Sequence, residues 1–173
     1  MKIKYLLITA LILIIGCAGT VKAPKWFNKP PSKKGYKYAV GTDISDRRQS
    51  ALVQARDVAL ADLAKQLEAE SETVNDQVLE EVADNTAVNV WTSSQKTMVA
   101  KTLRDYREVQ SDVKKSGRKY EAFVLIELNL VASQERMLAE LEKDAEVMKK
   151  LRKSELIQEM EVDIEAYRKR RGY

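Results

Sequence analysis

Hydrophobic and polar positions alternate with a period of two after residue 35, which is typical of a strand with one buried face. Tyr36, Tyr38 and Val40 alternate with Lys37 and Ala39, so we expect a half-buried first strand that ends near residues 41–42. Acceptor side chains of the kind that cap helices follow at once. These side chains predict the start of a helix. They belong to Asp43, Ser45 and Asp46.

The pattern then changes to steps of three and four residues, the period of an amphipathic helix. Much of the apolar face is alanine, which would let this helix lie close against a sheet. The face consists of Leu52, Ala55, Ala59, Leu63 and Leu67, with Ala51 and Val58 beside it. Residues 68–103 continue with helical spacing through an acidic stretch, and we interpret them as two helices or one interrupted helix. A solvated helix face explains this acidity better than a cation site, because the spacing of calcium loops is missing.

Residues 104–130 have the pattern of a β-hairpin. Residues 114–117 supply the turn, since Gly117 can adopt a positive φ angle. Phe123 and Leu125 are apolar on the outward face of the second strand. They predict a central strand, a strand covered on both sides, or an assembly interface. The inward face of that strand alternates strictly and consists of Tyr120, Ala122, Val124, Ile126, Leu128 and Leu130.

Residues 133–171 contain neither glycine nor proline and predict a long amphipathic helix. At 1.5 Å per residue, this helix would extend about 60 Å. Its apolar stripes leave two alternatives: it folds back along the domain, or it projects and pairs with a neighbouring copy as a coiled coil. We favour projection and assign assembly contacts to the second hairpin strand and the tail. The assigned residues are Phe123, Leu125, Leu138, Leu141, Met148, Leu156, Met160 and Ile164.

The first sixteen residues have the layout of a secretory signal. Lys2 and Lys4 precede an apolar run over residues 5–15, which is shorter than the twenty or so residues of a membrane-spanning helix. The order Leu13-Ile14-Ile15-Gly16-Cys17 resembles the lipobox of bacterial lipoproteins. That resemblance implies cleavage after residue 16 and acylation of Cys17, and an ordinary signal with a chance cysteine is the alternative. Two or three acyl chains would hold the protein almost permanently in a membrane leaflet.

All three prolines lie between residues 24 and 31, so residues 17–34 predict an extended tether between the lipid and the fold. Trp26 and Phe27 in this tether either dock on the domain or lie at the membrane interface, and we favour docking. The predicted organisation is a signal peptide (1–16), a lipidated tether (17–34), an α+β domain (35–130) and a helical tail (131–173).

Composition excludes several classes of function. Charged residues make up 32% of the 173 residues, so most of the chain should be soluble and folded. The chain has no histidine and one cysteine, which excludes histidine-dependent triads, histidine-ligated zinc, internal disulfides and thiolate metal clusters. Loss of residues 1–16 removes Lys2 and Lys4 and lowers the formal charge from +4 to +2, which gives nucleic-acid binding no electrostatic support. We expect no enzymatic activity, cofactor, metal or nucleic-acid partner.

Several of these motifs together resemble the LPP-twenty family of bacterial lipoproteins. The resemblance covers about residues 17–130, and its specific parts are Pro24-x-Trp26-x-x-x-Pro30-Pro31 and Tyr38-Ala39-Val40-Gly41. The alanines of the predicted helix add weaker support. Membership implies an α+β, dodecin-like fold in which a long alanine-rich helix packs on a three-stranded antiparallel sheet. The long C-terminal amphipathic helix lies outside the resemblance.

The resemblance also implies a structural role at the outer membrane. Related lipoproteins occur in outer-membrane rings and basal disks of flagella, and others are surface-exposed antigens. Ala18 stands after Cys17 where an aspartate would retain a lipoprotein in the inner membrane, by resemblance to sorted lipoproteins. We expect a lipid-anchored, homo-oligomeric scaffold of the outer membrane that associates with flagellar envelope components. The alternative is a small-ligand or partner-binding module unrelated to motility.

Overall fold

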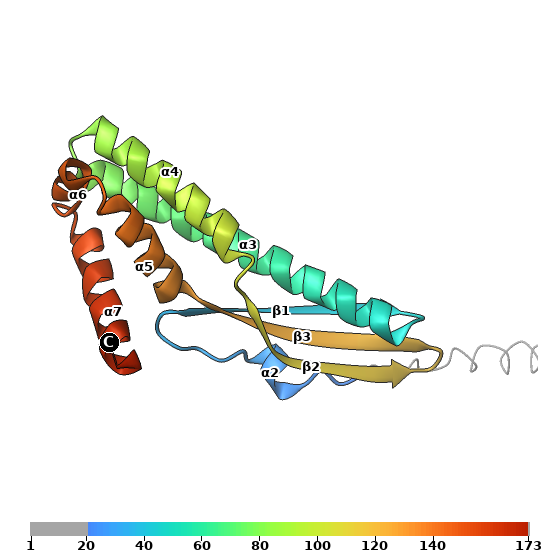
Figure 1. Cartoon of the computed structure of the whole chain (residues 1–173). Coiled ribbons are helices and arrows are strands. Elements are labelled where there is room, and N and C mark those ends of the chain that lie inside the picture. Colours follow the sequence, from blue (N-terminus) through green and yellow to red (C-terminus); the bar gives the residue numbers. More distant parts are fainter. Residues whose placement is uncertain (1–20, 173) are drawn as a thin grey trace, which may run out of the picture.

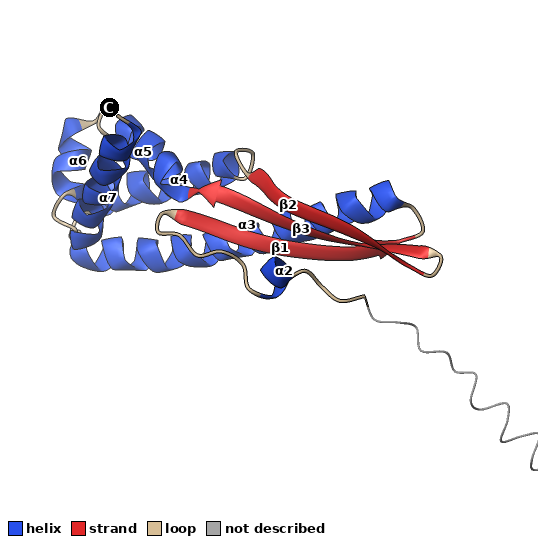
Figure 2. Ribbon diagram, turned by 90° about the horizontal axis from the view of Figure 1, so that it is seen from below, coloured by secondary structure: helices blue, strands red, loops and turns tan. Residues whose placement is uncertain are grey.

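The computed structural model describes residues 21–172 and shows an elongated molecule with a sheet at one end and a group of helices at the other (Figures 1 and 2). The strands form an antiparallel sheet in the order β1-β3-β2, and a long helix packs on it, which confirms the predicted α+β class. The elements are α2 (Lys25–Asn28), β1 (Tyr36–Ser45), α3 (Arg48–Glu81), α4 (Asn85–Thr102), β2 (Arg107–Ser116), β3 (Lys119–Asn129), α5 (Leu130–Leu141), α6 (Ala145–Leu151) and α7 (Glu155–Arg171).

A seam of small residues brings α3 close to the sheet. Ala51, Ala55 and Ala59 are completely buried on the face of α3 that meets β1 and β3. Gly41 of β1 lies opposite them, and a Cβ atom there would stand 2.1 Å from the carbonyl oxygen of Ala55. Only a glycine therefore fits at this strand position. Farther along the helix the seam gives way to larger buried residues, Leu63 and Leu67.

The buried face of β1 and the residue at which this strand ends both differ from the predictions. Ala39, and not the larger Tyr36 and Tyr38, belongs to the core beneath α3, because the close helix leaves room only for small side chains. The strand also continues to Ser45, since its ladder with β3 extends to Tyr120. The predicted helix-start residues therefore lie in or just after the strand. Helix α3 begins later, and its N-cap residue makes no side-chain cap.

Strand β3 occupies the centre of the sheet, as one of the sequence alternatives for Phe123 and Leu125 predicted. Its predicted inward face packs under α3 and includes Ala122, Val124, Ile126 and Leu128. Strand β2 has a register shift between Glu108 and Gln110, and this bulge interrupts the alternation of its inward and outward positions. Gly117 has the predicted positive φ angle, +60°, in the hairpin turn, but the turn is shorter than residues 114–117 because β2 continues to Ser116.

The segment of residues 21–31, which we call the strap, crosses the face of the sheet opposite to α3 (Figure 1). The ring of Phe27 in α2 packs edge-on against Phe123, with the ring centroids 5.1 Å apart. Trp26 in turn contacts Phe27 at 6.3 Å. Lys114 of β2 donates a hydrogen bond of 2.6 Å to the carbonyl oxygen of Lys22. Docking on the domain is therefore confirmed for Phe27, and Trp26 packs half-buried against Phe27.

Residues 82–84 separate α3 from α4, so residues 68–103 contain the end of one helix and a second complete helix. Asp84 is the N-cap of α4, and its carboxylate accepts a hydrogen bond of 2.9 Å from the amide of Ala87. Lys150 of α6 pairs with the same carboxylate at 2.8 Å. This turn therefore joins the C-terminal helices to the α3–α4 hairpin.

The tail folds back along the molecule, so the prediction of one long projecting helix is wrong. Three helices replace it, and each new start has an N-cap residue with an oxygen side chain: Asn129, Asp144 and Ser154. The Asn129 and Asp144 side chains accept hydrogen bonds from backbone amides, which favours a break even without glycine or proline. Helices α5–α7 pack with the far ends of α3 and α4, and we call this group the helical head.

The described residues form two hydrophobic cores that share α3. One core lies between the sheet and the first half of α3. The other lies in the helical head, where Trp91 of α4 is completely buried beside residues of α5, α6 and α7. The head core combines residues from both sides of position 130. The tail predicted to start there is therefore part of the folded body.

Candidate functional site

The predicted lipidation residue, Cys17, lies outside the described residues. The described chain begins four residues later, at Val21, and enters the strap directly. The strap is attached to the sheet at two places, through the ring contact of Phe27 and the hydrogen bond to Lys22. The described chain therefore starts at the sheet end of the molecule and far from the helical head (Figure 1).

The predicted assembly residues lie mainly in the protein's own cores. Phe123 and Leu125 are buried on the strap side of the sheet, with exposed fractions of 2% and 0%. Five of the tail residues are buried in the helical head, and Leu156 packs partly exposed against that core. The seven buried side chains are covered by the chain itself and are not free to contact another copy, which corrects their assignment, whereas the assignment of the partly exposed Leu156 stays a prediction. The five buried residues are Leu138, Leu141, Met148, Met160 and Ile164.

A polar cluster ties the three strands together on the outer face of the sheet. The Tyr38 hydroxyl donates a hydrogen bond of 2.7 Å to Glu127, and Arg107 donates one of 2.8 Å to the other carboxylate oxygen. Burial and the Glu127 hydrogen bond raise the pKa of Tyr38 to about 12. Burial alone would raise the pKa of Glu127, but the hydrogen bonds from Tyr38 and Arg107 lower it. The cluster is satisfied internally, so we interpret it as structural.

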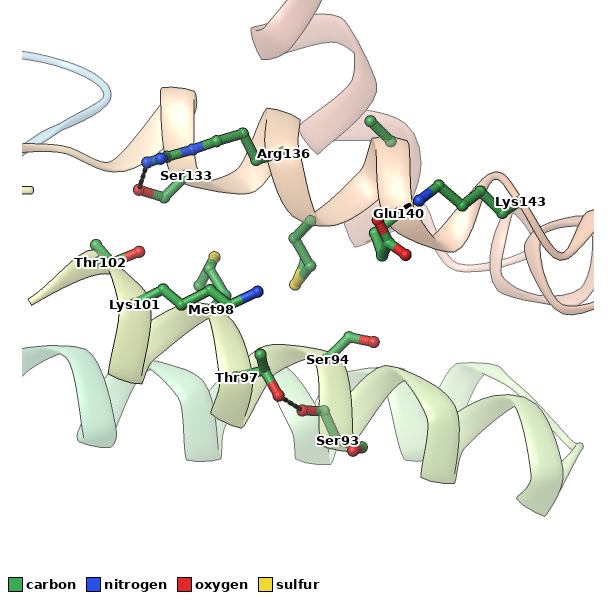
Figure 3. A pocket seen from close by; sticks show the side chains of 12 residues that line it. Ser93, Ser94, Thr97, Met98, Lys101, Thr102, Ser133, Arg136, Glu140 and Lys143 are labelled. Atoms are coloured by element: carbon green, nitrogen blue, oxygen red, sulfur yellow. Dashed lines mark hydrogen bonds and ion pairs between the residues drawn. The ribbon is translucent and has the colours of Figure 1, made fainter.

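A cleft of about 750 Å³ lies between α4 and α5 (Figure 3). One wall comes from residues 93–102 of α4, and the other comes from residues 133–140 of α5 and from Lys143, which follows that helix. Its deepest residues are buried and of mixed chemistry: Met98, Thr102, Ser133 and Met137. The helix spacing places these residues on the facing sides of the two helices, because each set repeats at three to four residues.

Three basic side chains and one carboxylate border the cleft. Arg136 is occupied, since it pairs with Asp105 at 2.6 Å and donates a hydrogen bond of 3.3 Å to Ser133. Lys143 pairs with Glu140 at 2.6 Å. The hydrogen bond and charge of Lys143, together with the charge of Lys101, lower the pKa of the Glu140 carboxyl. The carboxylate therefore stays ionised, and the cleft carries a surplus of positive charge.

Lys101 differs from its neighbours because it makes no ion pair with any described residue. Figure 3 shows its ammonium group directed along α4 toward the middle of the cleft, on the side of Met98. The Glu140 carboxylate points toward α4 from the opposite wall. The cleft thus offers one cation without a fixed partner, above a floor with two thioethers.

Sequence patterns do not indicate this cleft. The hydroxyl residues of α4 and the basic residues of α5 lie more than thirty positions apart, and each set is ordinary for a helix surface. Met98 fits a core face, and the sequence assigns no role to Lys101 or Lys143. The serine and threonine residues on one half of α4 are the feature of the sequence that comes closest to indicating the cleft. These residues indicate a polar cleft only when α5 is known to lie opposite them.

Within residues 21–172, no three potential ligands of the carboxylate, cysteine or histidine type come together to hold a metal ion. None of the described helices combines the length and the apolar character needed to cross a membrane. Comparison with models of protein families gives no match for this chain, and comparison with curated proteins also gives none. The resemblance to the LPP-twenty family therefore stays a prediction that depends on the motifs quoted above.

Proposed function

We propose that this protein is a structural lipoprotein of the bacterial outer membrane, anchored through acylated Cys17. The lipobox-like order of residues 13–17 supports the anchor, and the short docked strap supports its position. A single acyl chain binds a membrane weakly, whereas two or three hold almost permanently. Cys17 is thus the attachment point, with no catalytic or redox role.

The docked strap is the observation that carries the proposal. Val21 lies four positions after Cys17, and an extended chain spans at most about 3.6 Å per residue, so the two lie within about 14 Å of each other. The strap, which begins at Val21, attaches to the sheet, so the anchor point lies near the sheet. The 34 residues of α3 extend about 51 Å at 1.5 Å per residue, and they lead from the sheet to the helical head. An anchored protein would hold its sheet beside the membrane and its head away from it.

The two outer strands of the sheet are the remaining surfaces for assembly. Strands β1 and β2 each have one side without a neighbouring strand, and open sheet edges accept strands from other chains. The bulge in β2 interrupts its edge, whereas β1 pairs over ten residues without a register shift. We therefore assign self-assembly to the β1 edge. By resemblance to the LPP-twenty family, the assembled form is a ring or disk associated with the flagellum.

Replacement of Cys17 tests the anchor. The variants Cys17→Ala and Cys17→Ser should both release the protein from washed membranes, and mass spectrometry of the native N-terminus should find a diacylglyceryl group on the cysteine. The variant Ser32→Ala in the tether is the matched control and should stay membrane-bound. If the two Cys17 variants remain as firmly attached as the native chain, the proposed anchor is wrong.

Assembly and the flagellar association need separate measurements. Light scattering of the detergent-extracted protein should give a mass above that of one chain, and a mass of one chain at every concentration would contradict the scaffold. Cryo-tomography of cells without the protein should show an altered ring or disk at the flagellar base. An unaltered flagellar base would contradict the flagellar association and would favour a general role in the envelope.

The cleft favours a second candidate function, a lipid-anchored binding module. Its volume lies within the 300–1,000 Å³ range of small-ligand sites, and it combines apolar and polar residues as such sites do. Its position in the helical head would place it away from the anchored end of the molecule (Figure 1).

A further inference from the structure

The cleft between α4 and α5 has the features of a ligand site beyond the proposed structural role. A helix–helix contact that served stability alone would bring apolar side chains together, yet here the facing walls hold hydroxyl and charged groups around a space of about 750 Å³. Thr102 and Ser133 line one end of the cleft and are buried, with exposed fractions of 1% and 2% (Figure 3). The Ser133 hydroxyl already donates a hydrogen bond to the carbonyl oxygen of Asn129 and accepts one from Arg136. The charged rim therefore supplies the groups for the polar atoms of a ligand.

The floor suits an apolar body of variable shape. Met98 and Met137 approach from opposite helices, with exposed fractions of 9% and 5%. Methionine has three rotatable side-chain bonds and a polarizable sulfur, so it adapts to different surfaces and makes favourable contacts with aromatic rings. Two facing methionines therefore provide a flexible apolar contact beneath the polar rim.

The rim suits a negative charge. Lys101, Arg136 and Lys143 outnumber the single carboxylate of Glu140 among the residues that line the cleft. Arg136 and Lys143 already have carboxylate partners, at 2.6 Å in each case. Lys101 forms no ion pair within the described part of the chain, and its ammonium group points to the middle of the cleft (Figure 3). An arriving anion would therefore meet Lys101 first.

We propose that this cleft binds a small organic anion, with a phosphate or carboxylate group at Lys101 and an apolar body against Met98 and Met137. The Glu140 carboxylate repels the anion across the cleft, and the positive charge of Lys143 cancels much of that repulsion. The arrangement makes binding stronger when the anion and the apolar body belong to one molecule. It also makes binding sensitive to salt, because the rim is solvent-exposed.

Calorimetric titration of the full-length protein in neutral detergent, with phenyl phosphate as the probe, tests the site. We expect saturable binding to one site, and about tenfold weaker binding of inorganic phosphate, which lacks the apolar body. Lys101→Ala should weaken phenyl phosphate binding about fivefold. Lys96→Ala removes an exposed lysine of the same helix that does not line the cleft, and it should leave the affinity unchanged.

Glu140→Gln provides a test of opposite sign, since it should tighten phenyl phosphate binding about threefold by removing the opposing charge. A gain of affinity cannot come from misfolding, so this variant separates the charge effect from damage to the fold. Absence of saturable binding would overturn the proposal, as would equal losses in Lys101→Ala and Lys96→Ala. Competition by phosphatidylglycerol added to the detergent would assign the site to a lipid headgroup and overturn the soluble anion. None of these results depends on Cys17 acylation or on assembly.

Discussion

Replacement of Gly41 by alanine is the most severe small change that the structure offers. The added Cβ atom would lie 2.1 Å from the carbonyl oxygen of Ala55 and 2.5 Å from the amide nitrogen of Ala59. Both obstacles are backbone atoms of α3, so no side-chain rotation relieves the overlap. The helix and the strand must separate by about 1 Å to restore ordinary contact distances.

The separation affects a whole seam. Ala39 of β1 is 1% exposed, and Ala51, Ala55 and Ala59 of α3 are fully buried along the same contact. A gap of 0.5–1 Å forfeits a quarter to a half of each dispersion contact across it. Overpacking in a well-packed core usually costs about 1–3 kcal/mol, and rigid backbone neighbours place this change near the upper value, about 3 kcal/mol. For a chain of this size, that loss lowers the melting temperature by about 6–12 °C.

Urea denaturation followed by far-ultraviolet circular dichroism measures this loss as a lower transition midpoint at constant slope. Gly117→Asn is the matched control: Gly117 has a positive φ angle that asparagine tolerates, and a Cβ there meets no atom within 4 Å. That variant should stay close to the native midpoint. Ala55→Gly should fail to rescue Gly41→Ala, because the carbonyl oxygen remains. A midpoint for Gly41→Ala equal to that of Gly117→Asn would refute the close approach of α3.

Two further predictions concern the outer face of the sheet. Phe27→Ala removes the ring that packs on Phe123, so the strap should loosen at a cost of about 1–2 kcal/mol. Trypsin should therefore cleave the strap faster in this variant than in the control variant Asn28→Ala. Equal cleavage rates in the two variants would contradict the docked strap. The pKa of Tyr38, raised from 10.0 to about 12, means that its hydroxyl stabilises the fold below about pH 10 and that this contribution disappears as pH rises toward 12. Absorbance at 295 nm should show this late ionisation, and Glu127→Gln should lower that pKa; an unchanged value would exclude the hydrogen bond as a cause.

The strands show where sequence patterns suffice and where they fail. The alternation of β3 predicts its inward face correctly, because a central strand with a helix above it buries an apolar residue at every second position. In β1 the larger residues Tyr36 and Tyr38 mislead, since the close helix selects the smallest side chains for the buried face. Size and hydrophobicity are thus poor guides where two backbones nearly touch.

The tail shows the limit of apolar stripes. Leu138, Met148 and Ile164 were expected to contact a second copy, but a stripe indicates burial without saying what covers it. At the break before α6 the Asp144 side chain caps the new helix, whereas at the break before α7 the side chain of the N-cap residue Ser154 makes no cap. The absence of glycine and proline hides both breaks. The cleft needs two helices from distant parts of the chain to lie side by side. Its position therefore follows from the fold and from no local pattern.

Helix α3 belongs to both cores, yet none of residues 68–77 is buried. This ten-residue stretch spans about 15 Å between the last buried residue of the sheet core, Leu67, and the first of the head core, Val78. Its amide hydrogens are held chiefly by the helix's own ladder. In solvent deuterium they should exchange sooner than those of either flanking turn, because the partly buried Val74 holds this stretch to the head core less firmly than the completely buried Val78. The longest helix of the described chain would therefore open first in its middle.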